Sequence, residues 1–151
     1  MNTHTVSAFV LCLLLSAVSR GDEADDVKAE RKALAGKWIC QSSEVNGIKR
    51  GEKESQDQSF TFDGETFIQE DAETGDAFKG TYQLDLSGKL KVLSTKVTVE
   101  TKEHTIRYIF ERDGDTLKVC AHLLPGSELP KEFLAPEGSK RMYAVFKRAK
   151  K

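Results

Sequence analysis

Alternation of apolar and polar residues dominates the chain after residue 36. The clearest case is the segment from Phe78 to Asp85, in which every second residue is apolar or glycine. A period of two is typical of a strand that buries one face. The same pattern predicts eight strands, at 37–45, 59–63, 66–70, 78–85, 89–99, 105–112, 116–123 and 142–148. A change of phase at Val92-Leu93 predicts a bulge in the fifth of them.

The connections between these strands differ in length at the two ends of the predicted sheet. Three tight turns, at 63–64, 87–88 and 113–115, are rich in Asp, Ser and Gly and all fall at one end. The connections at the other end are 46–58, 71–76, 100–104 and 124–141. Consecutive antiparallel strands of this kind favour an all-β fold, an eight-stranded up-and-down barrel with a closed end and a loop-rimmed mouth. A sandwich of two sheets, built from the same strands, is the alternative.

A short helix is predicted before the first strand, over Asp25–Ala35. Its first turn is acidic, which complements the helix dipole, and Gly36 ends it. Trp38 follows at once and is the only tryptophan of the chain. The short helix and this large ring are therefore expected at the closed end of the barrel, with the ring as a plug.

Composition limits the chain to one domain of ordinary charge. It has 151 residues, of which 31% are charged, and a net charge of -1. This length suffices for one hydrophobic core and not for two. Because the charge is nearly balanced, we expect no nucleic acid as a partner. We expect the mature chain to be a monomer.

An apolar run near the N-terminus, Val6–Val18, resembles the core of a secretory signal. At 13 residues it is shorter than the roughly 20 that a membrane-spanning helix needs. Small residues at Ala17 and Ser19 suit cleavage after residue 19, although the end could fall anywhere in 19–23. The prediction is a signal peptide at 1–19 and one barrel domain at 24–151. The protein is then exported, periplasmic or extracellular, and has no stable membrane insertion after cleavage. An uncleaved anchor is the alternative.

Removal of the signal leaves two cysteines, Cys40 and Cys120. Cys40 shares the predicted inner face with Trp38, whereas Cys120 alternates with Leu117 and Val119 and is expected to point outward. Side chains on opposite faces cannot reach disulfide geometry. Two free thiols are therefore predicted, with a disulfide as the alternative in an oxidising compartment.

Several segments carry a family likeness. Gly36-Lys37-Trp38 resembles the Gly-x-Trp opening of lipocalins, and Arg148 on the last strand would pack over Trp38 as the lipocalin arginine does. A closer resemblance is to the lipocalin-like domain of unknown function that is common in secreted planctomycete proteins. The segments that carry it are 34–38, 44–47, 80–85, 113–120, 130–133 and 146–148. This resemblance implies the barrel fold and export, and it implies no activity.

The candidate ligand-binding residues are the aromatic side chains of the predicted inner faces and of the last long connection. They are Phe62, Phe78, Tyr82, Tyr108, Phe110 and Phe133. Small barrels fill their interiors with side chains, so these rings are first of all core. If part of the interior is hollow, they would hold a small apolar molecule in a modest cup at the mouth. Phe133 folds over the mouth in this reading, and covers a strand face in the alternative. A filled barrel that contacts a protein or the cell envelope is the alternative function.

No catalytic or metal site is predicted. His104 and His122 are the only histidines after the signal, too few and too loosely spaced for a zinc site. The chain has no Gly-x-Ser-x-Gly motif, and no Cys-His pair stands at a spacing that suggests a nucleophile with its base. We therefore expect a protein that is not an enzyme and that uses no cofactor, with an enzyme of unrecognised type as the alternative.

Overall fold

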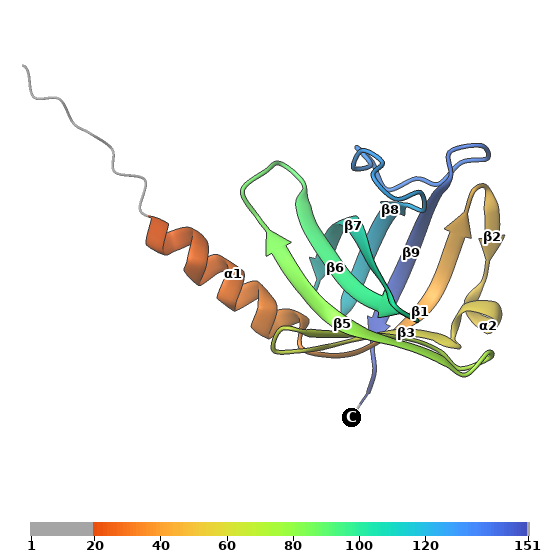
Figure 1. The fold of residues 1–151 in the computed structure, drawn as a ribbon, viewed down its shortest axis with the longest axis horizontal. Helices are drawn as coiled ribbons and strands as arrows, with labels where there is room; N and C mark the ends of the chain where they lie inside the picture. The colour runs from red at the N-terminus through yellow and green to blue at the C-terminus, as the bar shows by residue number, and fades with distance from the viewer. Residues whose placement is uncertain (1–19, 151) are drawn as a thin grey trace, which may run out of the picture.

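The computed structural model describes residues 20–150, so the predicted signal at 1–19 lies outside the described residues. Within residues 20–150 the chain forms two helices and nine strands (Figure 1). The helices are α1 (Arg20–Leu34) and α2 (Glu52–Ser55). The strands are β1 (Gly36–Val45), β2 (Ile48–Arg50), β3 (Gln58–Asp63), β4 (Thr66–Asp71), β5 (Asp76–Asp85), β6 (Lys91–Val99), β7 (Lys102–Asp113), β8 (Thr116–His122) and β9 (Arg141–Arg148). Over the described range, neither helix has the length and apolar character needed to cross a membrane.

Eight of the strands form a closed antiparallel barrel. The order is β1-β3-β4-β5-β6-β7-β8-β9, and β9 returns to pair with β1. This last pairing places Trp38 opposite Arg148 and Val45 opposite Met142. The predicted all-β, up-and-down barrel is thus confirmed, and the sandwich alternative is wrong because the sheet has no break. Helix α1 lies at one end, as predicted (Figure 1).

The end of helix α1 is held by side chains of the first and last strands. The last carbonyl groups of a helix have no partner within the helix. The indole Nε1 of Trp38 donates to the Leu34 carbonyl (2.8 Å), and the Arg148 guanidinium donates to the carbonyls of Ala33 and Ala35 (both 2.6 Å). The guanidinium also lies over the indole, 4.2 Å from the ring centroid. The predicted plug is therefore also the C-terminal cap of the helix.

Gly36 makes the turn from helix to strand possible. Its φ of 113° lies in a region that side-chain-bearing residues rarely adopt, and a Cβ there would lie 3.4 Å from Nη1 of Arg148. Arg148 is fixed from its other side by Asp115, whose Oδ1 accepts from Nε at 2.9 Å. The turn and the cap therefore depend on each other.

A buried carboxylate fixes the middle of α1 to the barrel. Glu30 is 8% exposed, and it accepts from Nε of Arg112 on β7 (2.8 Å) and from Nζ of Lys91 on β6 (3.0 Å). Burial acts to raise the pKa of Glu30, but the hydrogen bonds and charges of Arg112 and Lys91 outweigh it and hold that pKa below its ordinary value of 4.5. The carboxylate therefore stays charged at neutral pH and joins α1 to two strands.

Aromatic rings fill the part of the barrel nearest to α1. Phe60 stacks on Phe146 with 4.4 Å between ring centroids, and it meets Phe67 edge-on at 5.1 Å. Phe62 meets Tyr82 edge-on at 5.0 Å. All of these side chains are nearly inaccessible to solvent. The closed half of the barrel is therefore a packed core.

The connection expected as a loop at 46–58 contains a short strand and a short helix. Asn46 (φ 50°) and Gly47 (φ 87°) form a two-residue turn, after which β2 pairs back onto the end of β1. Helix α2 follows, and its Ser55 is 1% exposed and lies 3.5 Å from the Ser43 hydroxyl on β1. β1 pairs with β3 only over Gly36–Ile39, so α2 lies where the two strands have separated.

The bulge predicted at Val92-Leu93 is wrong. β6 keeps a continuous register with both neighbours through these residues. Leu93 belongs to the interior cluster, and the outward Val92 is also buried, at 8% exposed, opposite the buried Ile109. Because both faces of β6 are buried here, consecutive residues are apolar, and this loss of alternation is the pattern that suggested a bulge. The observed irregularity lies in β1, between Cys40 and Ser42.

Replacement of Trp38 by alanine is expected to lower the free energy of unfolding by about 3–5 kcal/mol, because it leaves a cavity and removes a cap of α1. Urea titration followed by circular dichroism measures this. Ile48→Ala is the control: Ile48 is 68% exposed, so a change below about 0.5 kcal/mol is expected. Equal effects of the two substitutions would contradict the role of the plug.

Glu30→Gln is expected to lower the free energy of unfolding by about 1–3 kcal/mol at neutral pH, because it removes two charge-assisted hydrogen bonds. The pKa of Glu30 is lowered in the folded chain, so its contribution is present above the unfolded pKa and is lost as pH falls below 4.5. The difference between the two proteins should shrink over that range in urea titrations at several pH values. Glu70→Gln is the control, because the Glu70–Lys37 pair is exposed and is expected to contribute under about 1 kcal/mol. A Glu30→Gln effect independent of pH would contradict the ion-pair explanation.

Candidate functional site

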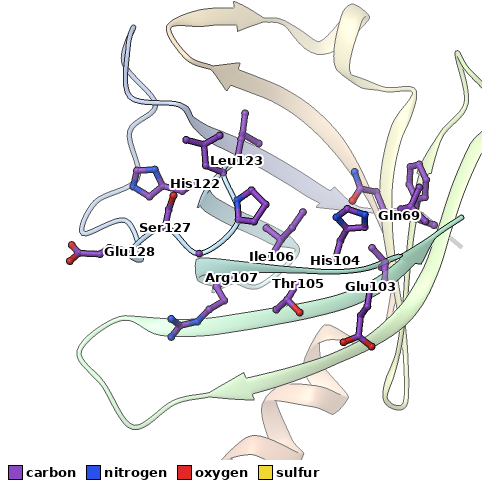
Figure 2. A pocket seen from close by; sticks show the side chains of 16 residues that line it. Gln69, Glu103, His104, Thr105, Ile106, Arg107, His122, Leu123, Ser127 and Glu128 are labelled. Carbon is purple, nitrogen blue, oxygen red and sulfur yellow. The ribbon is translucent and has the colours of Figure 1, made fainter. Parts of the chain in front are cut away.

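The mouth of the barrel contains a cavity of about 640 Å³. It lies between β7 and the segment that follows β8, and the ends of β4, β5 and β6 complete its wall (Figure 2). Its apolar lining is Phe78, Val97, Val99, Ile106, Leu123, Leu124 and Pro125. Its polar lining includes Gln69, Glu103, His104, Arg107, His122 and Glu128. The cavity thus lies at the end of the barrel opposite α1, which is the end where the sequence places the loop-rimmed mouth; that it holds a ligand stays a prediction.

Strand register explains which side chains enter this cavity. Gln69 pairs with Phe78, two residues from the pair of the buried Phe67 with Gly80. Thr95 pairs with Ile106, two residues from the interior pair Leu93–Tyr108, and Val97 pairs with His104 two residues farther along. Alternation therefore directs these side chains inward, above the packed aromatic rings. The cavity begins where the large rings end.

A difference in strand length explains why the cavity opens to one side. β7 pairs with β6 from Lys102 to Phe110, but with β8 only from Tyr108 to Asp113. After His122 the chain leaves the sheet and forms the segment at 123–128. The upper part of β7 and this segment face each other across the opening (Figure 2).

The polar groups of the cavity sit mostly on its rim. His104 and Gln69 come from inward positions of β7 and β4 (Figure 2). Arg107 and His122 come from outward positions, and Glu128 from the loop. Positive and negative groups are mixed, so the rim favours no strongly charged ligand.

Of the six predicted ligand residues, only Phe78 lines the cavity. Phe62, Tyr82, Tyr108 and Phe110 belong to the packed core, each 2% exposed or less. They lie closer to α1 than the hollow part of the barrel. The sequence pattern identified their inward direction and did not reveal their depth.

Phe133 lies on the outside of the barrel. Its ring meets Tyr143 of β9 edge-on at 6.3 Å, and Tyr143 alternates with the inward Ala144. This placement corresponds to the alternative in which Phe133 covers a strand face. The connection at 123–140 therefore folds over β8 and β9 and contributes to the cavity only through its first residues.

The two buried phenols have different surroundings. Burial raises the pKa of Tyr108 to about 12, against the opposing effect of the Thr95 hydroxyl. Burial also raises the pKa of Tyr82, against Arg31, whose guanidinium lies over the ring at 4.7 Å from its centroid. The Tyr82 hydroxyl has no hydrogen-bond partner within residues 20–150. Neither phenol reaches the cavity.

The predicted ligand residues, which are all aromatic, leave out most of the residues that line the cavity. The inward alternation of Leu93, Thr95, Val97 and Val99, and of Ile106 on the next strand, was visible in the sequence. If the paired residues of neighbouring strands are counted from the tight turns toward the mouth, Val97 and Ile106 fall closer to the mouth than the aromatic rings of the core. The contribution of 123–128 had no such signal, because it depends on where the chain leaves the sheet.

In residues 20–150 the histidines and cysteines do not form a second site. His104 and His122 both line the cavity, and no group of three or more potential metal ligands occurs within the described range. Cys40 lies in the interior and Cys120 lies outward beneath the last connection, with its Sγ 3.5 Å from the Leu134 carbonyl. Both thiols are free, as predicted; both are also buried, and burial raises the pKa of each.

Comparison with known proteins gives no match: no protein-family model, no curated protein and no solved structure is significantly similar to this chain. The closed barrel of eight antiparallel strands is consistent with a lipocalin-like fold. The function must therefore be argued from the cavity and the surfaces of this structure.

Both cysteines are expected to react slowly with a thiol reagent while the protein is folded, because each is buried and its thiolate is disfavoured. Unfolding in denaturant without a reductant should expose both. Mass spectrometry of labelled peptides containing Cys40 and Cys120 measures this. Recovery of the two peptides as one disulfide-linked species would contradict the placement of the thiols.

Proposed function

We propose that the protein is an exported, lipocalin-like barrel that binds a small, largely apolar molecule at its mouth and catalyses no reaction. The cavity of about 640 Å³ is the observation that carries this proposal. Ligand sites typically enclose about 300–1,000 Å³ and combine apolar walls with a few polar groups. The periplasm or the extracellular space is its expected location, in line with the resemblance to secreted planctomycete domains.

The ligand would be held by aliphatic walls, not by the aromatic rings of the core. Val97, Ile106 and Leu123 approach the cavity from three different elements, and Phe78 contributes its one aromatic ring. Because the barrel is filled below this level, the ligand would sit near the surface. A compact molecule with one polar end, directed to the mixed rim of His104 and Arg107, fits this arrangement best.

A second candidate function is that of an interaction module for a protein or the cell envelope. Exposed leucines favour it: Leu123 is 46% exposed, Leu124 49% and Leu134 52%. Leu123 and Leu124 also line the cavity, so the apolar surface continues from its wall to the outside. Such a surface is typical of an interaction site.

Ile106→Glu tests the ligand proposal, because it places a carboxylate in the apolar wall. We expect at least a tenfold weaker affinity for anilinonaphthalene sulfonate, a fluorescent probe of apolar cavities, which corresponds to about 1.4 kcal/mol. Fluorescence titration measures the affinity. The matched control is Ile68→Glu, since Ile68 is similarly half-buried but points outward between Phe67 and Gln69 on β4.

Native mass spectrometry of the protein purified from its own secretion route complements this titration. A co-purified small molecule that is absent from Ile106→Glu would support the proposal. Equal probe binding by the two glutamate variants, or no probe binding by the unmodified protein, would contradict it.

A further inference from the structure

The upper part of β7 is a free strand edge. Residues 102–107 pair with β6 on one side, and no strand of the part of the chain that the structure describes pairs with them on the side of β8. Within residues 20–150, no backbone hydrogen bond joins this edge to the facing segment at 123–128. Five of its six residues are exposed, and only Ile106 is half-buried. An unpaired edge of this kind is a template for another strand.

The direction of the backbone groups shows which residues face the edge. The Ile106 carbonyl accepts from Oγ1 of Thr95 on β6 at 3.4 Å, so the backbone of Ile106 points toward β6. Successive residues of an antiparallel strand direct their N–H and C=O groups to opposite sides. Glu103, Thr105 and Arg107 therefore present their backbone groups at the free edge.

The charges along this edge are self-complementary, and we propose that a second copy of the chain pairs with it. In an antiparallel pairing about a two-fold axis at Thr105, Glu103 lies opposite Arg107 of the partner subunit, and the symmetry repeats this ion pair. The side chains of Glu103 and Arg107 are both on the outward face. Their backbone groups, like those of Thr105, face the free edge. One register therefore allows both the backbone hydrogen bonds between the two strands and the two ion pairs between their side chains.

The two registers shifted by one residue lack this complementarity. A slip by one residue would place Lys102 opposite Arg107 of the partner subunit, with two repulsions between like charges, and would reverse the faces of the strand. In the folded chain Glu103 already contacts Lys96, with 3.2 Å between Nζ and Oε1, but both side chains remain more than half exposed. Arg107 has no ion-pair partner among the described residues. The charge of Arg107 is therefore available to a second copy.

The proposed dimer also bears on the cavity. His104 lies opposite Ile106 of the partner subunit in this register. Within each subunit, His104 and Ile106 both line the cavity. The partner subunit would thus supply part of the wall at the side where β7 and β8 separate. The exposed Leu123 and Leu124 lie beside this opening. This inference departs from the monomer expected from the sequence, and it does not depend on the proposed ligand.

Sedimentation velocity of the purified, processed protein over a concentration series tests the proposal. We expect a monomer–dimer equilibrium. Glu103→Arg and Arg107→Glu should each raise its dissociation constant about tenfold, because each turns two attractive cross-strand pairs into repulsive ones. Circular dichroism and thermal unfolding of each variant verify that the barrel itself is intact.

A mixture of the two single variants provides the decisive control. In a mixed dimer every position 103 and its opposite position 107 carry opposite charges, so association should return to that of the unmodified protein. The double variant with both charges exchanged should also dimerise. Purely monomeric behaviour of the unmodified protein, dimers insensitive to these substitutions, or failure of the mixture to associate would each overturn the proposal.

Discussion

The contact between the first and last strands of the barrel, at Trp38 and Arg148, holds the rest of the structure in place. It closes the ring of strands. The same two side chains cap the C-terminal end of α1, because they donate hydrogen bonds to the three backbone carbonyls of residues 33–35. A helix this close to a sheet needs such partners, because its terminal carbonyls cannot pair internally. Glu30 adds a second fixed point through β6 and β7. Closure, capping and helix docking are therefore coupled.

The volume of the interior side chains decides where the barrel is full and where it is hollow. Near α1 the inward positions carry large rings, among them Phe60, Phe62 and Phe146. Toward the mouth they carry smaller or polar residues, such as Val97 and Gln69, and the space is left open. A small barrel of eight strands has room for one such hollow. The proposed ligand site follows from this decrease in the size of the inward side chains from α1 toward the mouth.

The mouth combines two features, a cavity and an unpaired strand edge. Both arise because β7 extends beyond its pairing with β8. The separation of these strands opens the cavity sideways and leaves backbone groups unpaired. A ligand and a second copy of the chain would thus meet at Ile106 and His104. Occupancy of one site is then linked to occupancy of the other wherever the two share a side chain.

The sequence by itself determined the eight barrel strands, the direction of most side chains, the plug and the opposite faces of Cys40 and Cys120, because period, turn residues and parity are local properties. It could not separate Phe78, which lines the cavity, from Phe62 and Tyr108, which lie in the packed core, because all three share the inward phase. Depth depends on how far each strand is staggered against its neighbours. Tertiary structure alone decided the bulge in β1, the course of 123–128 and the free edge of β7, since each depends on where strands distant in sequence begin and cease to pair.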